Sequence, residues 1–146
     1  MRELAERVAS ELGGESGESP GFAWVRVPPE KMLEAARMIR EAGLEHVKAV
    51  TAIDRPEEGE IEVVYHASSY EPGRRGVLAL RTSVPRDDPR LPSLVGVWPS
   101  AEYMEREQWE MLGVVFEGHP RLERLLLPED FEGVHPLRKD YEVRTA

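Results

Sequence analysis

The sequence contains no cysteine. Disulfides, zinc–thiolate sites and a cysteine nucleophile are therefore excluded. Iron–sulfur clusters are excluded on the same ground, because their irons are held almost entirely by thiolates. Any redox chemistry must then belong to a bound organic cofactor or to a neighbouring protein.

Long apolar runs are also missing. No stretch approaches the roughly 18 residues that span a bilayer. The first residues, MRELAERVASEL, carry three glutamates and no apolar centre, which is unlike a signal peptide or an anchor. We expect a cytoplasmic protein with no direct membrane insertion.

Positive charge is scarce. Lysine and arginine number 19 against 28 aspartates and glutamates, a formal net charge of −9. This balance argues against nucleic acid and against anionic membrane surfaces as partners. Glycine-rich phosphate cradles and the common hydrolase and zinc-protease motifs are absent as well. We therefore expect no cofactor and no nucleotide site.

The residue pattern predicts secondary structure in blocks. Helical periodicity and helix stop signals predict helices at residues 2–12, 29–42 and about 100–112. Strand-like composition and turn signals predict strands at residues 21–27, 47–53 and 61–67, and clean alternation predicts a further strand at residues 77–84. The last three strands most simply form an antiparallel meander. Residues 14–20 are expected to be a linker, and residues 86–93 an exposed loop.

Helices and strands in blocks indicate an α+β fold rather than alternating α/β. We expect two layers, with helices packed on a small mixed or largely antiparallel sheet. The chain is predicted to divide into an α+β domain over residues 1–113 and an extended, irregular C-terminal segment over residues 114–146.

That C-terminal segment combines apolar residues with helix and strand breakers. Gly and Pro interrupt it every few residues, so no regular element runs far. Yet it is too apolar for a disordered tail, and each large side chain would gain about 1.5–3 kcal/mol on full burial. A partner surface is the alternative to self-burial. The apolar residues are Val114, Val115, Phe116, Leu122, Leu125, Leu126, Leu127, Phe131, Val134, Leu137 and Tyr141.

Two groups of residues invite a chemical interpretation. His119 and His135 each precede a proline, and Glu129 and Asp130 lie between them. Two imidazoles and a carboxylate could bind a metal, but the spacing fits no standard ligand pattern. The favoured interpretation is that each His-Pro fixes a turn and that the ring donates a hydrogen bond to the backbone.

The second group lies on the helix near residue 105. Glu102, Arg106 and Glu110 follow one another at intervals of four residues, an arrangement that favours ion pairs. Paired carboxylates could instead perform acid–base catalysis. The pattern favours an exposed ion-pair ladder, which contributes about 0.3–0.5 kcal/mol per pair.

The run EREQWEMLGVVFEGHPRLERLLLPEDFEGVHPLRKDY, residues 105–141, closely resembles the signature of the C subunit (the 30 kDa-type subunit) of NADH:quinone oxidoreductase, respiratory complex I. That family shows an E-R-E-x-x-D-x-x-G helix end, then G-H-P, a leucine-rich stretch, P-E-D with an aromatic and H-P-L-R-K-D with an aromatic. Upstream pieces at residues 52–54, 63–68, 92–93 and 97–101 fit too. The sequence departs from this family pattern at Gln108, Glu110 and Leu112, and it has one extra residue, Val134.

The resemblance implies a cofactor-free structural subunit. Its C-terminal extension would wrap the large, hydrogenase-derived quinone-site subunit of the D type, with iron–sulfur subunits nearby. The protein would then lie peripherally on the cytoplasmic face of the cell membrane. The residues predicted to form the partner interface are Glu105, Arg106, Glu107, Phe116, His119, Leu125, Leu126, Leu127, Phe131, His135, Arg138, Lys139 and Asp140.

Two alternatives remain open. The family includes counterparts in archaeal F420H2 dehydrogenases and in membrane-bound NiFe hydrogenases, so the electron donor is not specified. An alternative of another class is a free-standing small hydrolase that uses Glu105, Glu107 and His119.

Overall fold

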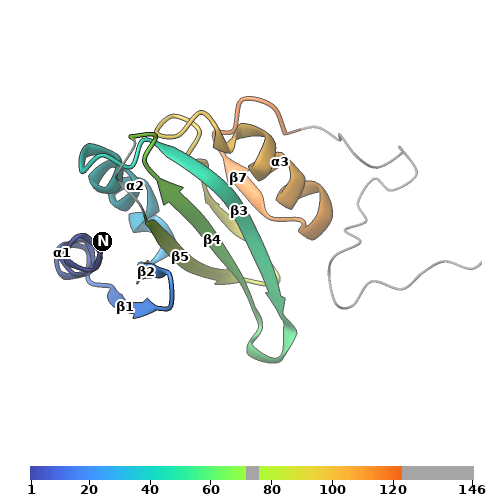
Figure 1. The fold of residues 1–146 in the computed structure, drawn as a ribbon. Helices are drawn as coiled ribbons and strands as arrows, with labels where there is room; N and C mark the ends of the chain where they lie inside the picture. The colour runs from blue at the N-terminus through green and yellow to red at the C-terminus, as the bar shows by residue number, and fades with distance from the viewer. Residues whose placement is uncertain (72–75, 123–146) are drawn as a thin grey trace, which may run out of the picture.

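The computed structural model describes residues 1–71 and 76–122. Within them lie a five-stranded sheet, a two-stranded sheet and three α-helices (Figure 1). The helices are α1 (Arg2–Leu12), α2 (Met32–Glu41) and α3 (Ala101–Leu112). The strands are β1 (Glu15–Ser19), β2 (Phe22–Arg26), β3 (His46–Arg55), β4 (Glu60–Ser68), β5 (Val77–Pro85), β6 (Arg90–Pro92) and β7 (Val115–Glu117). Single 3-10 turns occur at Pro29–Lys31 and Pro56–Glu58.

The large sheet has the strand order β1-β2-β5-β4-β3. The strands β3, β4 and β5 form the predicted antiparallel meander. The pairing of β2 with β5 is parallel, whereas β1 with β2 is antiparallel. The predicted α+β fold with a mixed sheet is therefore confirmed.

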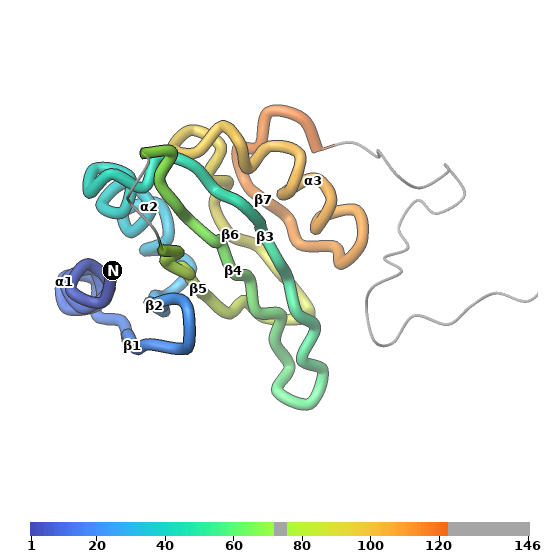
Figure 2. The backbone as a smooth tube through the Cα atoms, in the orientation of Figure 1, coloured from blue at the N-terminus to red at the C-terminus, as the bar shows by residue number. Residues whose placement is uncertain are grey.

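Three segments predicted to be irregular contain strands: the expected linker, the expected loop, and the start of the C-terminal segment, where β7 lies. The expected linker at residues 14–20 contains β1, which forms a hairpin with β2 through a turn at Gly21, where φ is +88°. The polar composition of β1 gives no strand signal in the sequence, because this strand gains its stability from backbone pairing rather than from apolar side chains. The expected loop at residues 86–93 contains β6, which pairs in parallel with β7 (Figure 2).

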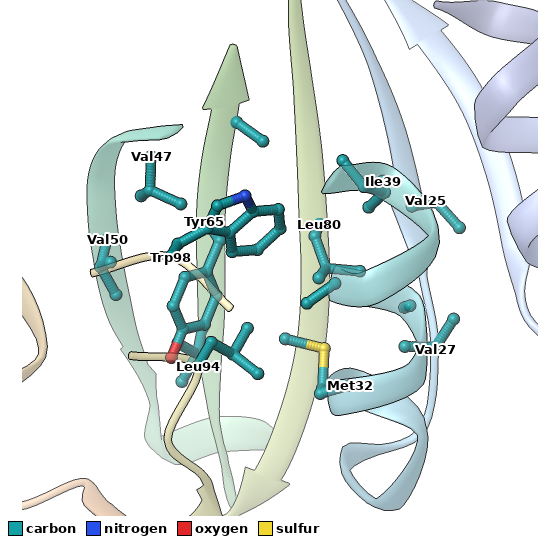
Figure 3. Packing of buried hydrophobic residues seen from close by; sticks show 14 of the residues in the cluster. Val25, Val27, Met32, Ile39, Val47, Val50, Tyr65, Leu80, Leu94 and Trp98 are labelled. Carbon is teal, nitrogen blue, oxygen red and sulfur yellow. The ribbon is translucent and has the colours of Figure 1, made fainter. Parts of the chain in front are cut away.

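The core lies between one face of the large sheet and the helices. From the sheet it takes Val25, Tyr65 and Leu80, and from α2 it takes Met32 and Ile39 (Figure 3). Trp98 is completely buried, and its indole Nε1–H donates to the Leu44 carbonyl at 2.9 Å. This bond satisfies the one polar atom of the largest core side chain.

The core continues past Gly113. Val114 and Phe116 are completely buried and belong to the same apolar cluster, and β7 is held by β6. A boundary at residue 113 therefore cuts through the core. The remaining apolar residues of the predicted segment, from Leu125 onward, lie outside the described residues.

Gly113 ends α3 in the left-handed conformation, with φ +80° and its N–H donating to the Trp109 carbonyl at 2.9 Å. Gly113→Ala should lower the free energy of unfolding by about 1 kcal/mol, because a Cβ disfavours this conformation. Gly96→Ala is the matched control, since an added Cβ there meets nothing within 4 Å and φ is not positive. Urea unfolding of both variants measures the difference. Equal stability would show that the cap conformation does not matter.

Candidate functional site

The helix α3 carries Glu105, Arg106 and Glu107, the charged residues of the catalytic and ion-pair interpretations of the sequence. It lies along β3, the edge strand of the large sheet (Figure 1). Gln108 Oε1 accepts the Ala52 N–H at 3.2 Å, and Ser100 Oγ accepts the Val47 N–H at 3.0 Å. Side chains of α3 and of the residue before it thus satisfy backbone groups that an edge strand would otherwise leave unpaired.

Glu105 is the centre of a buried polar network. Its side chain has no exposed surface. One carboxylate oxygen accepts the Tyr65 hydroxyl at 2.6 Å and the Leu94 N–H at 2.9 Å, and the other accepts the Ser93 hydroxyl at 2.6 Å. Glu105 therefore joins α3 to β4 and to the segment that follows β6.

Burial and hydrogen bonding oppose each other at this carboxyl group. Removal from water raises the pKa of Glu105, while the hydrogen bonds from Ser93, Tyr65 and Leu94 lower it, and the net shift is upward. The pKa of Tyr65 is raised well above its ordinary value, chiefly by burial and then by the Glu105 charge. Tyr65 therefore stays a hydroxyl donor at any ordinary pH.

The expected exposed ion-pair ladder on this helix is wrong. Arg106 and Glu110 are buried, with exposed fractions of 8% and 1%. The inward stripe of α3 thus includes charged residues, because the helix packs on the polar backbone edge of β3 as well as on the apolar core. Contributions typical of surface pairs do not apply to side chains at this depth.

His119 fixes a turn, as the favoured interpretation predicts. Its Nε2 lies 2.9 Å from the Glu102 carbonyl oxygen, and its Nδ1 accepts the Arg121 N–H at 2.9 Å. Both bonds form together only when the ring is neutral and carries its proton on Nε2. The other residues of the metal interpretation, His135, Glu129 and Asp130, lie outside the described residues. Within the described ranges no three potential ligands cluster.

Two further buried carboxylates did not emerge from the sequence. Asp54 makes a two-pronged ion pair with Arg86, at 2.6 and 2.9 Å. Glu62 is 2% exposed and is contacted by Arg26, Arg55 and Arg81. Burial raises the pKa of Glu62, but the hydrogen bonds and charges of Arg81, Arg55 and Arg26 together outweigh it, so the net pKa is lowered.

The predicted interface residues fall into three groups. Glu105 and Phe116 lie inside the chain's own fold, and Arg106 is nearly covered. Glu107 and His119 are half-buried at the surface. The others lie outside the described residues, namely Leu125, Leu126, Leu127, Phe131, His135, Arg138, Lys139 and Asp140.

This arrangement does not support a hydrolase that uses Glu105, Glu107 and His119. Glu105 cannot reach a substrate, because it has no exposed surface and both its oxygens accept hydrogen bonds. Both ring nitrogens of His119 are engaged with the backbone. The described residues define a class instead: a small α+β domain whose buried carboxylates bind its own elements together.

Comparison with known proteins places this domain in a family. Residues 25–146 match the family of the respiratory-chain NADH dehydrogenase 30 Kd subunit. The chain belongs to this family and is a complex I 30 kDa-type subunit of a quinone oxidoreductase.

Individual relatives agree with this assignment. The chain is 44% identical over 131 residues to the C subunit of the NADH-quinone oxidoreductase of Roseiflexus sp. (strain RS-1), covering 86% of this chain and 72% of that protein. It is 39% identical over 126 residues to the C subunit of the F(420)H(2) dehydrogenase of Methanosarcina mazei, covering 86% and 78%. A chain in the structure of the membrane-bound sulfane sulfur reductase, an archaeal respiratory membrane complex, superposes with a TM-score of 0.82 at 29% identity, covering 96% and 84%.

Proposed function

We propose that this chain is a non-catalytic, cofactor-free subunit in the peripheral arm of an NADH or F420H2:quinone oxidoreductase. Its role is to hold the large quinone-site subunit, with iron–sulfur subunits as neighbours, on the cytoplasmic face of the membrane. The observation that carries the proposal is the environment of Glu105. This residue, which begins the E-R-E part of the family signature, is completely buried and accepts three hydrogen bonds within the fold, so it stabilises the domain and contacts no substrate.

The distribution of apolar residues along the chain also supports the proposal. The described part has a complete core of its own. The sequence from residue 123 onward still carries Leu125, Leu126, Leu127 and Phe131, which are typical anchors for a protein interface when they enter pockets of a partner. Arg138 and Asp140 would add charge-assisted hydrogen bonds across that interface. No helix among the described residues is long and apolar enough to cross a bilayer.

The membrane-bound hydrogenase counterpart is the second candidate. The fold superposes on a chain of a membrane-bound sulfane sulfur reductase, a respiratory membrane complex that is not named as a quinone oxidoreductase, and this is the ground for retaining a second candidate. The greater sequence identity to a subunit of an NADH-quinone oxidoreductase favours the first candidate.

The test is to purify the native complex through a tag on this chain and to assay quinone reduction with NADH, with F420H2 and with hydrogen in parallel. We expect a complex that contains the large subunit and reduces quinone with NADH or F420H2. The chain purified alone should carry no visible chromophore and no stoichiometric transition metal. Hydrogen as the sole effective donor would favour the second candidate, and a chain that purifies without partners would refute both.

A further inference from the structure

One face of the large sheet is not covered by any described helix. Side chains alternate along each strand, and the side that includes Val25, Tyr65 and Leu80 joins the core with α1 and α2. The opposite side is called the open face here. Its residues, by the strand register, include Phe22, Trp24, Arg26, Ala49, Thr51, Ile53, Arg55, Glu60, Glu62, Val64, His66, Val77, Ala79, Arg81 and Ser83.

The open face carries large apolar side chains among its charged ones. A sheet with one solvated face normally alternates apolar inward and polar outward residues. Here Phe22 and Ile53 point outward with 38% and 37% of their surface exposed. Val64 and Ala79 are buried on this side without joining the core cluster. Trp24 lies between Gly17, which has no side chain to displace its ring, and the Arg81 guanidinium 5.2 Å above it.

The centre of this face has more hydrogen-bond donors than acceptors. Arg26, Arg81 and Arg55 approach the Glu62 carboxylate at 2.6, 2.8 and 3.3 Å. Each guanidinium has about five N–H donors, while one carboxylate accepts about four hydrogen bonds. Their side chains remain 41%, 24% and 38% exposed, in the same order. Three positive charges therefore surround a single buried negative one.

Two further carboxylates lie near the cluster, and neither accepts its outward N–H groups. Glu15 and Glu60 stand opposite Arg26 and Arg55 in the strand register, but neither forms an ion pair with a described residue. Burial lowers the pKa of His66 more than its Ala49 contact raises it, so that ring adds no positive charge at neutral pH.

We propose that the open face is a second docking surface, which binds a segment of a neighbouring protein in the complex that carries aspartate or glutamate side chains among apolar ones. The carboxylates would take the outward N–H groups of the arginine cluster, and the apolar residues would cover Phe22, Trp24 and Ile53. Charge-assisted, two-pronged bonds are the strongest that guanidinium groups make. A second copy of this chain in two-fold symmetric contact would bring like faces together, and so arginine cluster against arginine cluster.

This inference rests on the proposed function only in assuming that the chain assembles with other subunits. Because the chain has no cysteine, one introduced cysteine is a unique probe. Thr51→Cys places it on the exposed part of the open face, and Glu11→Cys places a control at an exposed position of α1. Maleimide labelling rates are measured for each variant as the isolated full chain and in the assembled complex. A photo-crosslinker on the thiol introduced at position 51 then identifies the covering peptide by mass spectrometry.

Assembly should slow labelling of the Thr51→Cys chain at least tenfold more than that of the Glu11→Cys control. The crosslinked peptide should come from another subunit and contain aspartate or glutamate. Arg55→Gln should weaken this protection several-fold, whereas Arg37→Gln, at an exposed position of α2, should not. Normal assembly of a Thr51→Cys chain whose thiol is still freely labelled would overturn the inference and leave the proposed function intact. A crosslink to a second copy, or to a peptide without carboxylates, would overturn it as well.

Discussion

Glu105→Ala should lower the free energy of unfolding by about 3 kcal/mol or more, the largest effect we expect from a single substitution in the described part. The substitution leaves the Tyr65 hydroxyl, the Ser93 hydroxyl and the Leu94 N–H without their acceptor. A buried donor left unpaired costs about 1–3 kcal/mol. Urea unfolding followed by circular dichroism measures the change.

Glu107→Ala is the matched control. Glu107 lies two residues away on the same helix and is half-buried. Its side chain makes no hydrogen bond or ion pair with a described residue. We expect its loss to change the free energy of unfolding by less than about 0.5 kcal/mol, as is usual for such positions. If the two alanine variants were equally stable, the buried network would have no structural importance.

The pH dependence of stability separates the charge of Glu105 from its hydrogen bonds. A glutamate whose pKa is raised in the folded state stabilises the fold at acidic pH, and this contribution is lost as the pH rises through the raised value. Relative to Glu105→Gln, the native chain should therefore lose stability as the pH rises above the ordinary glutamate pKa of 4.5. Glu62 has a lowered pKa and acts in the opposite direction, so the comparison requires the glutamine variant as its reference.

The sequence predicted the parts of the fold that follow from periodicity. The amphipathic pattern of α1 and α2, the apolar composition of β3 and β4 and the alternation of β5 each produce a signal within a single element. Gly113 was recognisable as a helix end for the same local reason. The strands β1, β6 and β7 were missed because their stability comes from pairing with a neighbouring strand. Short strands of this kind produce no periodic signal of their own in the sequence.

The buried charges were harder to predict for a related reason. Spacing of four residues correctly suggested that Arg106 and Glu110 share a helix face, yet it could not say that this face points inward. Glu62 lies in an apolar strand whose arginine partners come from β2, β3 and β5. Such a site is visible only once the strand order is known.

Removing residues 123–146 should abolish assembly while leaving the domain folded. The chain that ends at Leu122 keeps every core residue of the part that the structure describes, including Val114 and Phe116. It loses all of Leu125, Leu126, Leu127 and Phe131, which we propose as the anchors on the quinone-site subunit. A chain cut after Gly113 is the contrasting control, because it also loses β7 and two core residues, and it should fail to fold.

The most direct measurement is the yield of the large subunit that co-purifies with the chain ending at Leu122, relative to the full chain, with circular dichroism recorded on both. The account predicts a native spectrum and a yield lowered at least tenfold. A folded, truncated chain that still recovers the large subunit at the full yield would contradict it.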